Sequence, residues 1–449
     1  MTEKVKEHPG TLKEYLKTSI PAVIDLSIQP IVWLYEAFLI GQISYAALGG
    51  VGFAFQFMLV TFTVVLTFVI GSALIINKYI GRNDMWAANH IFGQAMMIGI
   101  GLSFIIALIW YFGSPVLFKI IKESEPLGQT FGVGYLQTIA YFAPIIIVSF
   151  IALGIIRATG DTQYALIINV IIIGINIVLA PLLVFGQFGL PRLEAEGLAL
   201  AKGISFTVGF VLTVILVRSR KVNLYLSGRE LTTLKWVSVK LLFKTGFPAT
   251  VEQLTWSTGM LIISTYAARL GVIVLATHQI LLLLQGVMSM LYQGLGLGSM
   301  TLIGKKVGAD EHQRAEKTGF VAGAVTLSFV SLVSMVVYLY QTEIFRAFTN
   351  NQEVMDLGLT VIVIFAIVQI PKALNSVLIG SLRGAGELKW IMWVTIMGVV
   401  VFEISTSWAV VFIFNFALTG IWIVHGCDEI TRFMFNFFRF RNGKWKLQN

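Results

Sequence analysis

Twelve long apolar runs constrain the fold of this 449-residue chain more than any other feature of its sequence. A helix needs about 20 apolar residues to cross roughly 30 Å of hydrocarbon. Runs of that order lie at approximately residues 16–42, 50–77, 88–113, 127–155, 163–186, 197–217, 246–269, 274–303, 318–341, 356–382, 389–414 and 419–438. Only 12% of the residues are charged, whereas a soluble domain usually carries about 25%. We therefore expect an all-α polytopic membrane protein with twelve transmembrane helices.

The basic residues predict how these spans are oriented. If both termini are cytoplasmic, 25 Lys and Arg residues fall on the cytoplasmic side, five fall outside, and Lys202 and Lys372 fall within spans. This asymmetry follows the positive-inside rule, so the net charge of +9 needs no nucleic-acid partner. The polar segment 1–17 lacks a signal-peptide cleavage pattern, and we expect the first span to be retained. The expected location is the cytoplasmic (inner) membrane.

The two halves of the chain are similar at a nearly constant offset of 227 residues. The matches are 17–22 with 244–249, Lys78 with Lys305, Gly81 with Gly308 and, after a slip of one residue, 154–161 with 380–387. This repeat predicts two pseudo-symmetric six-helix lobes, at residues 1–217 and 246–449, joined by a basic cytoplasmic linker at 218–245. Parallel repeats of this kind enclose a site between the lobes and work by rocking of one lobe against the other.

Several functional classes find no support in the residues. Cys427 is the single cysteine, and the five histidines lack the spacing of metal ligands. Neither a P-loop, a nucleophile-elbow motif nor a pore-type filter sequence is visible. We expect neither an enzyme nor a channel, and no metal or cofactor other than a coupling ion.

Acidic residues within the spans are the first functional candidates, because a charge at the centre of a membrane helix costs at least about 2.5–3.5 kcal/mol. Asp25 and Glu36 are eleven residues apart on the first span, which places them on one helix face with Gln29 between them. The repeat offset places Glu252 opposite Asp25, so that one acid from each lobe would face the other. Trp256, one turn beyond Glu252, can offer a cation–π surface.

Short motifs distributed over residues 14–446 resemble the multidrug and toxic compound extrusion (MATE) family. The segments that carry this resemblance are residues 156–162, 176–182, 276–280, 304–309, 314–316, 382–386, 420–423 and 439–445. The resemblance implies a V-shaped, two-lobe fold that exports amphipathic, often cationic compounds. It also implies that inward movement of Na⁺ or H⁺ drives the export.

The resemblance places Glu36 where family members carry a coupling Asp. Asn176 is kept, but Ala180 replaces a fifth-helix Asp, and Lys202 stands at a Thr position. Na⁺ needs several oxygen donors, and an ammonium group offers hydrogen-bond donors and no acceptor. We therefore predict that Lys202 pairs with Glu36, and that H⁺ rather than Na⁺ is the coupling ion.

The second lobe shows the same exchange. The family's acidic position eleven residues before the tenth-helix Arg383 is Lys372, and Asn375 follows it. We predict that Lys372 pairs with a carboxylate, with Glu252 as the first candidate. Glu403 stands where the family tends to have a basic residue, and the sequence suggests no partner for it.

These observations predict a secondary active antiporter that exports amphipathic, cationic small molecules by alternating access. The predicted coupling residues are Glu36, Asp25, Asn176, Lys202, Glu252 and Lys372, and the predicted substrate-cavity residues are Gln29, Trp256, Gln253, Asn375 and Gln279. The alternative is a flippase for lipid-linked saccharides or another lipid. We expect a monomer whose partners are its solutes and membrane lipids, with no nucleic acid.

Overall fold

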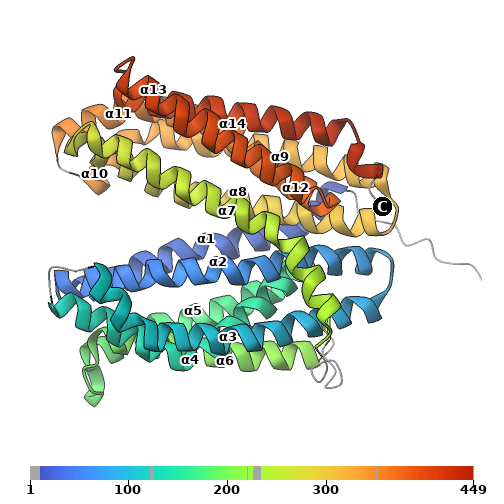
Figure 1. The fold of residues 1–449 in the computed structure, drawn as a ribbon, viewed down its shortest axis with the longest axis horizontal. Coiled ribbons are helices and arrows are strands. Elements are labelled where there is room, and N and C mark those ends of the chain that lie inside the picture. The colour runs from blue at the N-terminus through green and yellow to red at the C-terminus, as the bar shows by residue number, and fades with distance from the viewer. Residues whose placement is uncertain (1–10, 122–125, 220, 226–233, 350, 448–449) are drawn as a thin grey trace, which may run out of the picture. The chain divides into compact units, whose positions relative to one another are not determined.

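The fold was analysed in a computed structural model, which describes residues 11–121, 126–219, 221–225, 234–349 and 351–447. Every long element of this described chain is helical, and the all-α fold class is confirmed (Figure 1). The helices are α1 (Thr11–Gly41), α2 (Tyr45–Gly81), α3 (Met85–Ile121), α4 (Pro126–Ala158), α5 (Thr162–Phe185), α6 (Glu194–Arg218), α7 (Trp236–Arg269), α8 (Val272–Gly308), α9 (His312–Leu339), α10 (Gln341–Phe348), α11 (Gln352–Ala385), α12 (Leu388–Met397), α13 (Ser407–Phe412) and α14 (Ala417–Arg441). Between α12 and α13 the π-helix η3 (Gly398–Thr406) keeps the chain helical, and short 3₁₀ turns lie at η1 (Gln187–Gly189) and η4 (Lys444–Leu447).

The twelve expected spans correspond to twelve long helical segments of the described chain, with α12, η3 and α13 forming the eleventh. Most of these segments extend past the predicted ends, because polar residues continue a helix beyond the apolar stretch. The largest extension is in α7, which begins at Trp236, inside the stretch expected to be a linker. Ten segments are long and apolar enough to cross a membrane by composition. The other two, α7 and α14, carry polar or charged side chains near their middles.

The sequence repeat reappears in the geometry of the turns. The chain leaves α2 through Asn83 at φ 59° and leaves α8 through Asp310 at φ 62°, the residue 227 positions later. Likewise Gly160 after α4 and Gly386 after α11 have φ values of 96° and 95°. Asn, Asp and Gly are the residues that adopt this left-handed conformation at least cost. Gly160 and Gly386 therefore make equivalent left-handed turns in the two repeats.

The contacts of the structure divide the chain into two compact units. Unit 1 consists of Met1–Leu26 and Val251–Asn449, and unit 2 consists of Ser27–Thr250. Both α1 and α7 are thus shared: the first part of α1 belongs to unit 1, and the first part of α7 belongs to unit 2. The division expected from the sequence, at 1–217, 218–245 and 246–449, remains a prediction.

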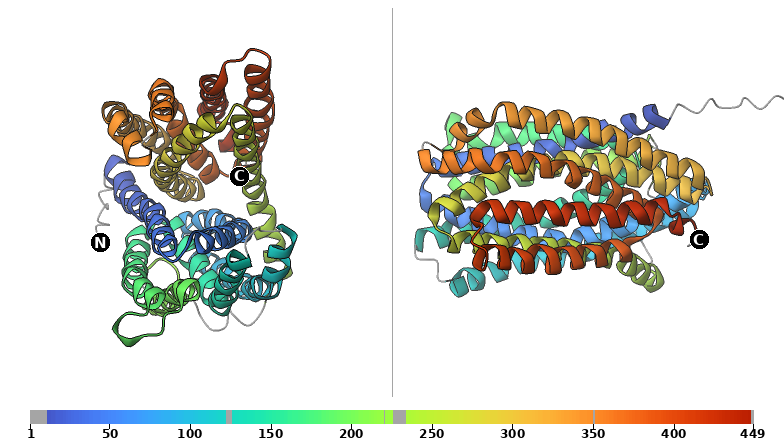
Figure 2. Two further views of the ribbon diagram at one scale, coloured as in Figure 1. Left: turned by 90° about the vertical axis from the view of Figure 1, so that its left-hand side faces the viewer. Right: turned by 90° about the horizontal axis from the view of Figure 1, so that it is seen from above.

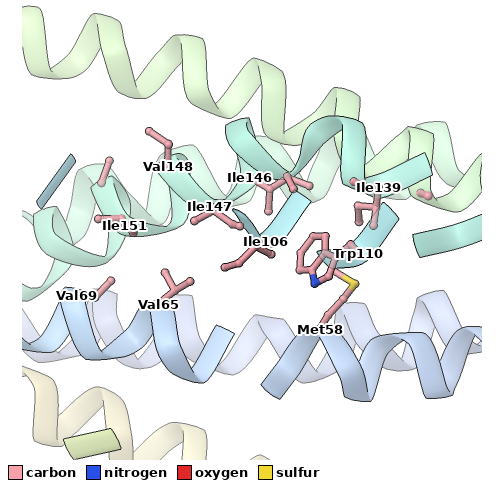
Figure 3. Close-up of a cluster of buried hydrophobic side chains, with 14 of the residues drawn as sticks. Met58, Val65, Val69, Ile106, Trp110, Ile139, Ile146, Ile147, Val148 and Ile151 are labelled. Carbon is pink, nitrogen blue, oxygen red and sulfur yellow. The ribbon is translucent and has the colours of Figure 1, made fainter. Parts of the chain in front are cut away.

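Each unit is organised around one central helix. In unit 2, α4 contacts α2, α3, α5 and α6, and in unit 1 its repeat equivalent α11 contacts α8, α9, α12 and α14. Within each unit the long helices run alongside one another (Figures 1 and 2). Branched aliphatic side chains from α2, α3 and α4 fill the core of unit 2 around Trp110 and Met58 (Figure 3). Tight packing of this kind holds membrane helices together, since lipid tails are as apolar as the helix surfaces.

Candidate functional site

The first candidate site lies in unit 2 and joins three helices through Glu36 of α1. Lys202 Nζ of α6 lies 2.7 Å from Glu36 Oε2, and Asn176 Nδ2 of α5 donates to Glu36 Oε1 at 2.8 Å. Glu36 and Asn176 are buried, and the Lys202 side chain is only 12% exposed. The expected contact between Lys202 and Glu36 is therefore present. We call Glu36, Asn176 and Lys202 the Glu36 cluster.

Two further helices complete the surroundings of the Glu36 cluster. The buried phenol of Tyr135 on α4 lies against the Lys202 ammonium group, and the ring of Phe55 on α2 lies 5.7 Å from Lys202 Nζ. Ala180, at the position where the family carries an acid, is fully buried. Lys202 therefore directs its charge into unit 2, between aromatic rings and a carboxylate.

The donor set of the Glu36 cluster does not suit a Na⁺ ion. The two groups that contact the Glu36 carboxylate, an ammonium and an amide N–H, are hydrogen-bond donors and cannot coordinate a cation. Asn176 Oδ1 is a buried oxygen without a partner among the described residues, but it is a single ligand. The Lys202 ammonium holds the place beside Glu36 that a cation would need.

The second candidate site lies in unit 1 and is centred on Glu429 of α14. Lys372 Nζ of α11 lies 2.8 Å from Glu429 Oε1, and Asn375 Nδ2 donates to Glu429 Oε2 at 3.0 Å. Arg432 contacts the same carboxylate at 3.0 Å and also pairs with Asp428 at 2.5 Å. All five side chains are buried. We call them the Glu429 cluster, and it repeats the lysine–carboxylate–asparagine pattern of the Glu36 cluster.

The expected partner of Lys372 was wrong. Lys372 pairs with Glu429 and not with Glu252, whose carboxylate instead accepts from Arg383 at 2.6 Å. Arg432 is buried inside unit 1, where its helix α14 packs against α11.

The expected opposition of Asp25 and Glu252, one acid from each lobe, was also wrong. Both residues belong to unit 1, because the first part of α1 packs with the second half of the chain. Asp25 is buried there. Glu36 belongs to unit 2, so the acidic face predicted for the first helix is divided between the two units.

A hydrogen-bonded chain extends from the Glu429 cluster to Glu403, the acid for which the sequence suggested no partner. Lys372 Nζ lies 3.3 Å from His425 Nε2, and His425 Nδ1 lies 2.8 Å from Glu403 Oε1. An ammonium group can only donate, so His425 Nε2 accepts and the Nδ1–H donates to Glu403. Glu403 is directed to His425 from the π-helix η3, whose wider turn shifts side-chain directions relative to an α-helix.

The remaining predicted cavity residues do not gather at one place. Asn375 belongs to the Glu429 cluster, and the ring of Trp256 lies 5.9 Å from the Lys372 ammonium. Gln29 is half-buried in unit 2, whereas Gln253 and Gln279 are exposed in unit 1. Their role in substrate binding stays a prediction, as do the coupling roles of all the residues named from the sequence.

Sequence reasoning missed the polar face of α14. His425, Asp428, Glu429 and Arg432 follow the i, i+3, i+4, i+7 spacing of one helix face, within a run read only as a membrane span. A group of ionisable residues within a predicted span is itself a signal of function, and this one could have been found from the sequence.

Comparison with known families also finds a repeat, with one match in each half of the chain. The MatE family model matches residues 21–182 and 248–409, one copy in each half of the chain. A probable multidrug resistance protein NorM from Thermotoga maritima is 24% identical over 442 residues, which cover 98% of this chain and 94% of that protein. Another from Bacillus anthracis is 22% identical over 417 residues, covering 92% and 91%.

Solved structures share the fold. A MOP superfamily transporter from Pyrococcus furiosus, described as having a binding pocket of reverse polarity, aligns with a TM-score of 0.89 at 18% identity and covers 100% of both chains. A multidrug resistance MATE family transporter in an outward-facing conformation aligns with a TM-score of 0.88 at 18% identity, covering 98% of this chain and 100% of that one. With two family matches spanning both repeats, this chain is a multi-pass membrane protein that belongs to the MATE family of transporters.

Proposed function

We propose that this protein is a secondary exporter of small amphipathic, cationic molecules that is driven by inward H⁺ rather than by Na⁺. The names of its relatives support multidrug export as the general activity. The observation that carries the choice of ion is the pairing of the Glu36 carboxylate with the Lys202 ammonium at 2.7 Å. A bound lysine takes the place of a bound metal cation.

The coupling step follows from the charges of the Glu36 cluster. With Glu36 ionised, the carboxylate and the ammonium form a neutral pair that tolerates a low-dielectric surrounding. A proton that enters and binds a Glu36 oxygen cancels the carboxylate charge, so the Lys202 ammonium loses its partner and must move to other acceptors. An organic cation that binds near the Glu36 cluster favours the ionised form of Glu36 and the release of the proton.

The Glu429 cluster gives the proposal a parallel in the second repeat. Lys372, Glu429 and Asn375 reproduce the same three residue types with the same kinds of contact. Here, however, Arg432 supplies a second cation to the carboxylate, so protonation of Glu429 would leave two buried cations beside Asp428. We therefore assign the cycling proton to Glu36 and a structural role to Glu429.

The rest of the proposal follows from the family and the sequence. The protein works as a monomer in the cytoplasmic membrane with both termini inside, and its two lobes alternate in exposing the solute. It needs no cofactor besides H⁺, no nucleic acid and no partner other than solutes and lipids. The other candidate, a flippase for lipid-linked saccharides or another lipid, stays a prediction that no contact among the described residues favours.

The test is ethidium transport by purified protein in proteoliposomes, measured by fluorescence under separately imposed pH and Na⁺ gradients. A pH gradient, with Na⁺ equal on both sides, is expected to drive ethidium transport. A Na⁺ gradient at equal pH is expected to leave the rate at the level of protein-free vesicles. Glu36→Gln keeps the hydrogen-bonding shape of the side chain and removes its proton, so pH-driven transport should fall by at least about tenfold.

Glu343→Gln, a change at an exposed glutamate of α10, is the matched control and should transport like the parent. Transport driven by Na⁺ at fixed pH, with no response to a pH gradient, would refute proton coupling. Full pH-driven transport by Glu36→Gln would show that the coupling proton is carried elsewhere.

A further inference from the structure

The buried charges around His425 in unit 1 form one connected group in which acids outnumber permanent bases. The group consists of the acids Glu403, Asp428 and Glu429 and the bases Lys372 and Arg432. The ring of His425 joins Glu403 to the others, and none of these residues is more than 8% exposed. With His425 neutral, three negative charges face two positive ones. The Glu36 cluster, by comparison, has one acid and one base.

This imbalance has an energetic consequence. A charge removed from water and left without an opposite charge is strongly destabilising. One added proton would bring the net charge of the group to zero. The buried group of unit 1 is therefore expected to bind one more proton.

The contacts indicate which residue holds this proton. His425 Nδ1 lies 2.8 Å from Glu403 Oε1, so a protonated ring would form an ion pair with Glu403. The other two acids each keep a base of their own, Lys372 with Glu429 and Arg432 with Asp428. A proton on His425 therefore produces three acid–base pairs.

Three other residues offer a place for the proton, and each fits less well. A proton on Asp428 would leave an ionised Glu403 paired with a neutral ring. A proton on Glu403 itself would need an acceptor, since the facing His425 Nδ1–H is already a donor. A proton on His278 of α8 would also need one, because neither ring nitrogen of His278 has a hydrogen-bond partner among the described residues.

Binding of this proton is linked to the position of Lys372. In the structure Lys372 Nζ lies 3.3 Å from His425 Nε2, a contact that requires a neutral ring because an ammonium group can only donate. A protonated ring carries a hydrogen on Nε2 as well, so this contact must break. The ammonium can turn away without losing its shorter contact with Glu429 at 2.8 Å. The protonated and neutral forms of His425 therefore differ in where Lys372 points.

A small pocket gives the His425–Glu403 pair contact with water. Both residues line this pocket, which has room for about one water molecule. Gln285 Oε1 and Trp422 Nε1 belong to the same lining and are buried atoms without a partner among the described residues. One water molecule can satisfy an acceptor and a donor at once. A water bound there lies against the pair and can pass a proton to it.

The count of charges covers every element packed around His425. The titratable or charged groups are Asp428, Glu429 and Arg432 on α14, Lys372 on α11, Glu403 on η3 and His278 on α8. The residues that α7 and α13 add to the pocket, such as Met260 and Ser407, do not titrate at ordinary pH. The balance is therefore set by the three acids and two bases already named.

We propose that His425 binds a proton opposite Glu403, which makes this pair a second proton site, separate from the one at Glu36. The site lies wholly in unit 1. Its proton is held within the fold and is not the one exchanged for a solute. The inference does not rest on the proposed export function, because it follows from the buried charges alone.

The test is nitrogen NMR of the purified full-length protein in nanodiscs, with isotope-labelled histidine. The chemical shifts of the two ring nitrogens distinguish a protonated imidazole from each neutral tautomer. The signals of His425 are identified by their loss in His425→Gln, and His90→Gln on α3 is the matched control that removes a different histidine. At mildly acidic pH, His425 is expected to carry hydrogen on both nitrogens. Raising the pH is expected to give the neutral form with hydrogen on Nδ1.

The variant Glu403→Gln tests the cause of this protonation. It removes one acid, so the remaining two acids and two bases balance without a proton on His425. At the same mildly acidic pH, the ratio of protonated to neutral His425 should fall by at least about tenfold. Glu343→Gln, at an exposed acid of α10, is the matched control and should leave the ratio unchanged. A thermal unfolding midpoint near that of the parent shows that each variant is folded.

A His425 ring that stays neutral at every pH at which the parent is folded would overturn the inference, and this result needs no variant. Unchanged protonation of His425 in Glu403→Gln would overturn it too. So would loss of the proton when Na⁺ is added at fixed pH, which would mean that a metal ion balances the acids.

The outcome is independent of the export assay. The NMR measurement uses neither a solute nor an ion gradient, so its failure leaves proton-driven export standing. Conversely, if His425 is protonated as expected but a pH gradient fails to drive ethidium transport, the second proton site stands and the proposed function falls.

Discussion

At the scale of single residues, the central feature is a lysine that pairs with a buried acid in each repeat. An ion pair removed from water gains little over a well-packed apolar pair, but breaking it by removal of one partner leaves an uncompensated charge. Lys202 and Lys372 therefore contribute to stability chiefly by preventing the free-energy cost of a buried carboxylate without a partner. An ionisable residue within a membrane helix is costly, which makes Glu36 and Lys202 candidates for function.

Removal of the Lys202 ammonium should destabilise unit 2. In Lys202→Met the Glu36 carboxylate keeps only the Asn176 amide, so we expect a loss of about 3–5 kcal/mol, the usual range for a broken buried pair. The double variant Glu36→Gln with Lys202→Met removes both charges and should recover most of this loss. Thermal unfolding of the detergent-solubilised protein measures both effects. A double variant that is no more stable than Lys202→Met would contradict a direct pair.

The two glutamates should respond differently to loss of charge. Glu429→Gln breaks buried ion pairs with both Lys372 and Arg432, whereas Glu36→Gln breaks a single ion pair with Lys202. We expect Glu429→Gln to lower the thermal unfolding midpoint and the yield of folded protein clearly more than Glu36→Gln. Gel-filtration profiles and thermal melts of the two variants provide the comparison. Equal or reversed sensitivity would argue against the structural role assigned to Glu429.

At the scale of elements, the central helix of each unit relies on close backbone approach. In unit 1, α11 packs against α8 through Gly380 and Gly384, which are four residues apart as in other small-residue helix contacts. A Cβ atom on Gly384 would lie 2.5 Å from the Met300 carbonyl oxygen and 3.0 Å from the Gly304 nitrogen. Both neighbours are backbone atoms, so the helices themselves would have to separate.

The variant Gly384→Ala should therefore be destabilising even though alanine favours helices. Overpacking at a contact of this kind costs about 1–3 kcal/mol, which should lower the thermal midpoint by several degrees. The control is Gly323→Ala on α9, where a Cβ atom would meet nothing within 4 Å. That change should be neutral or slightly stabilising. A Gly384→Ala variant as stable as Gly323→Ala would show that α8 and α11 are not in close contact.

At the scale of the whole molecule, the chain is a duplicated membrane protein whose repeats share turn geometry, central helices and a lysine–carboxylate–asparagine cluster. The shared turns at Asn83 and Asp310 lie on the side expected to be cytoplasmic. The distribution of the basic residues predicts this orientation, because the cytoplasmic loops of membrane proteins carry an excess of Lys and Arg. The topology can be tested independently of transport.

Single-cysteine labelling in intact cells tests the orientation. In a Cys427→Ser background, a membrane-impermeant maleimide should label Phe188→Cys, which lies on an exposed turn after α5 expected to be outside. It should leave Arg82→Cys, at the end of α2, unlabelled until the membrane is permeabilised. The reverse pattern would show that the chain is inserted the other way round.

Sequence reasoning predicted the helices and the repeat well because apolar runs and matching short segments, such as 154–161 and 380–387, can be read directly from the sequence. It predicted the contact of Lys202 with Glu36 through the family resemblance. It failed for Lys372 because the partner, Glu429, lies on a helix whose depth and rotation depend on packing against α11. It also failed to place Asp25 with unit 1, since the sharing of α1 between units has no local signature.

The measurement that tests the central claim most directly is the movement of protons across the membrane of proteoliposomes, recorded with a trapped pH-sensitive dye, when an ethidium gradient is imposed in Na⁺-free solution at equal pH on both sides. The account predicts that the parent moves protons in the direction opposite to ethidium, and that Glu36→Gln moves no more protons than protein-free vesicles do. Undiminished proton movement through Glu36→Gln, or ethidium transport by the parent without proton movement, would contradict the claim that Glu36 carries the coupling proton.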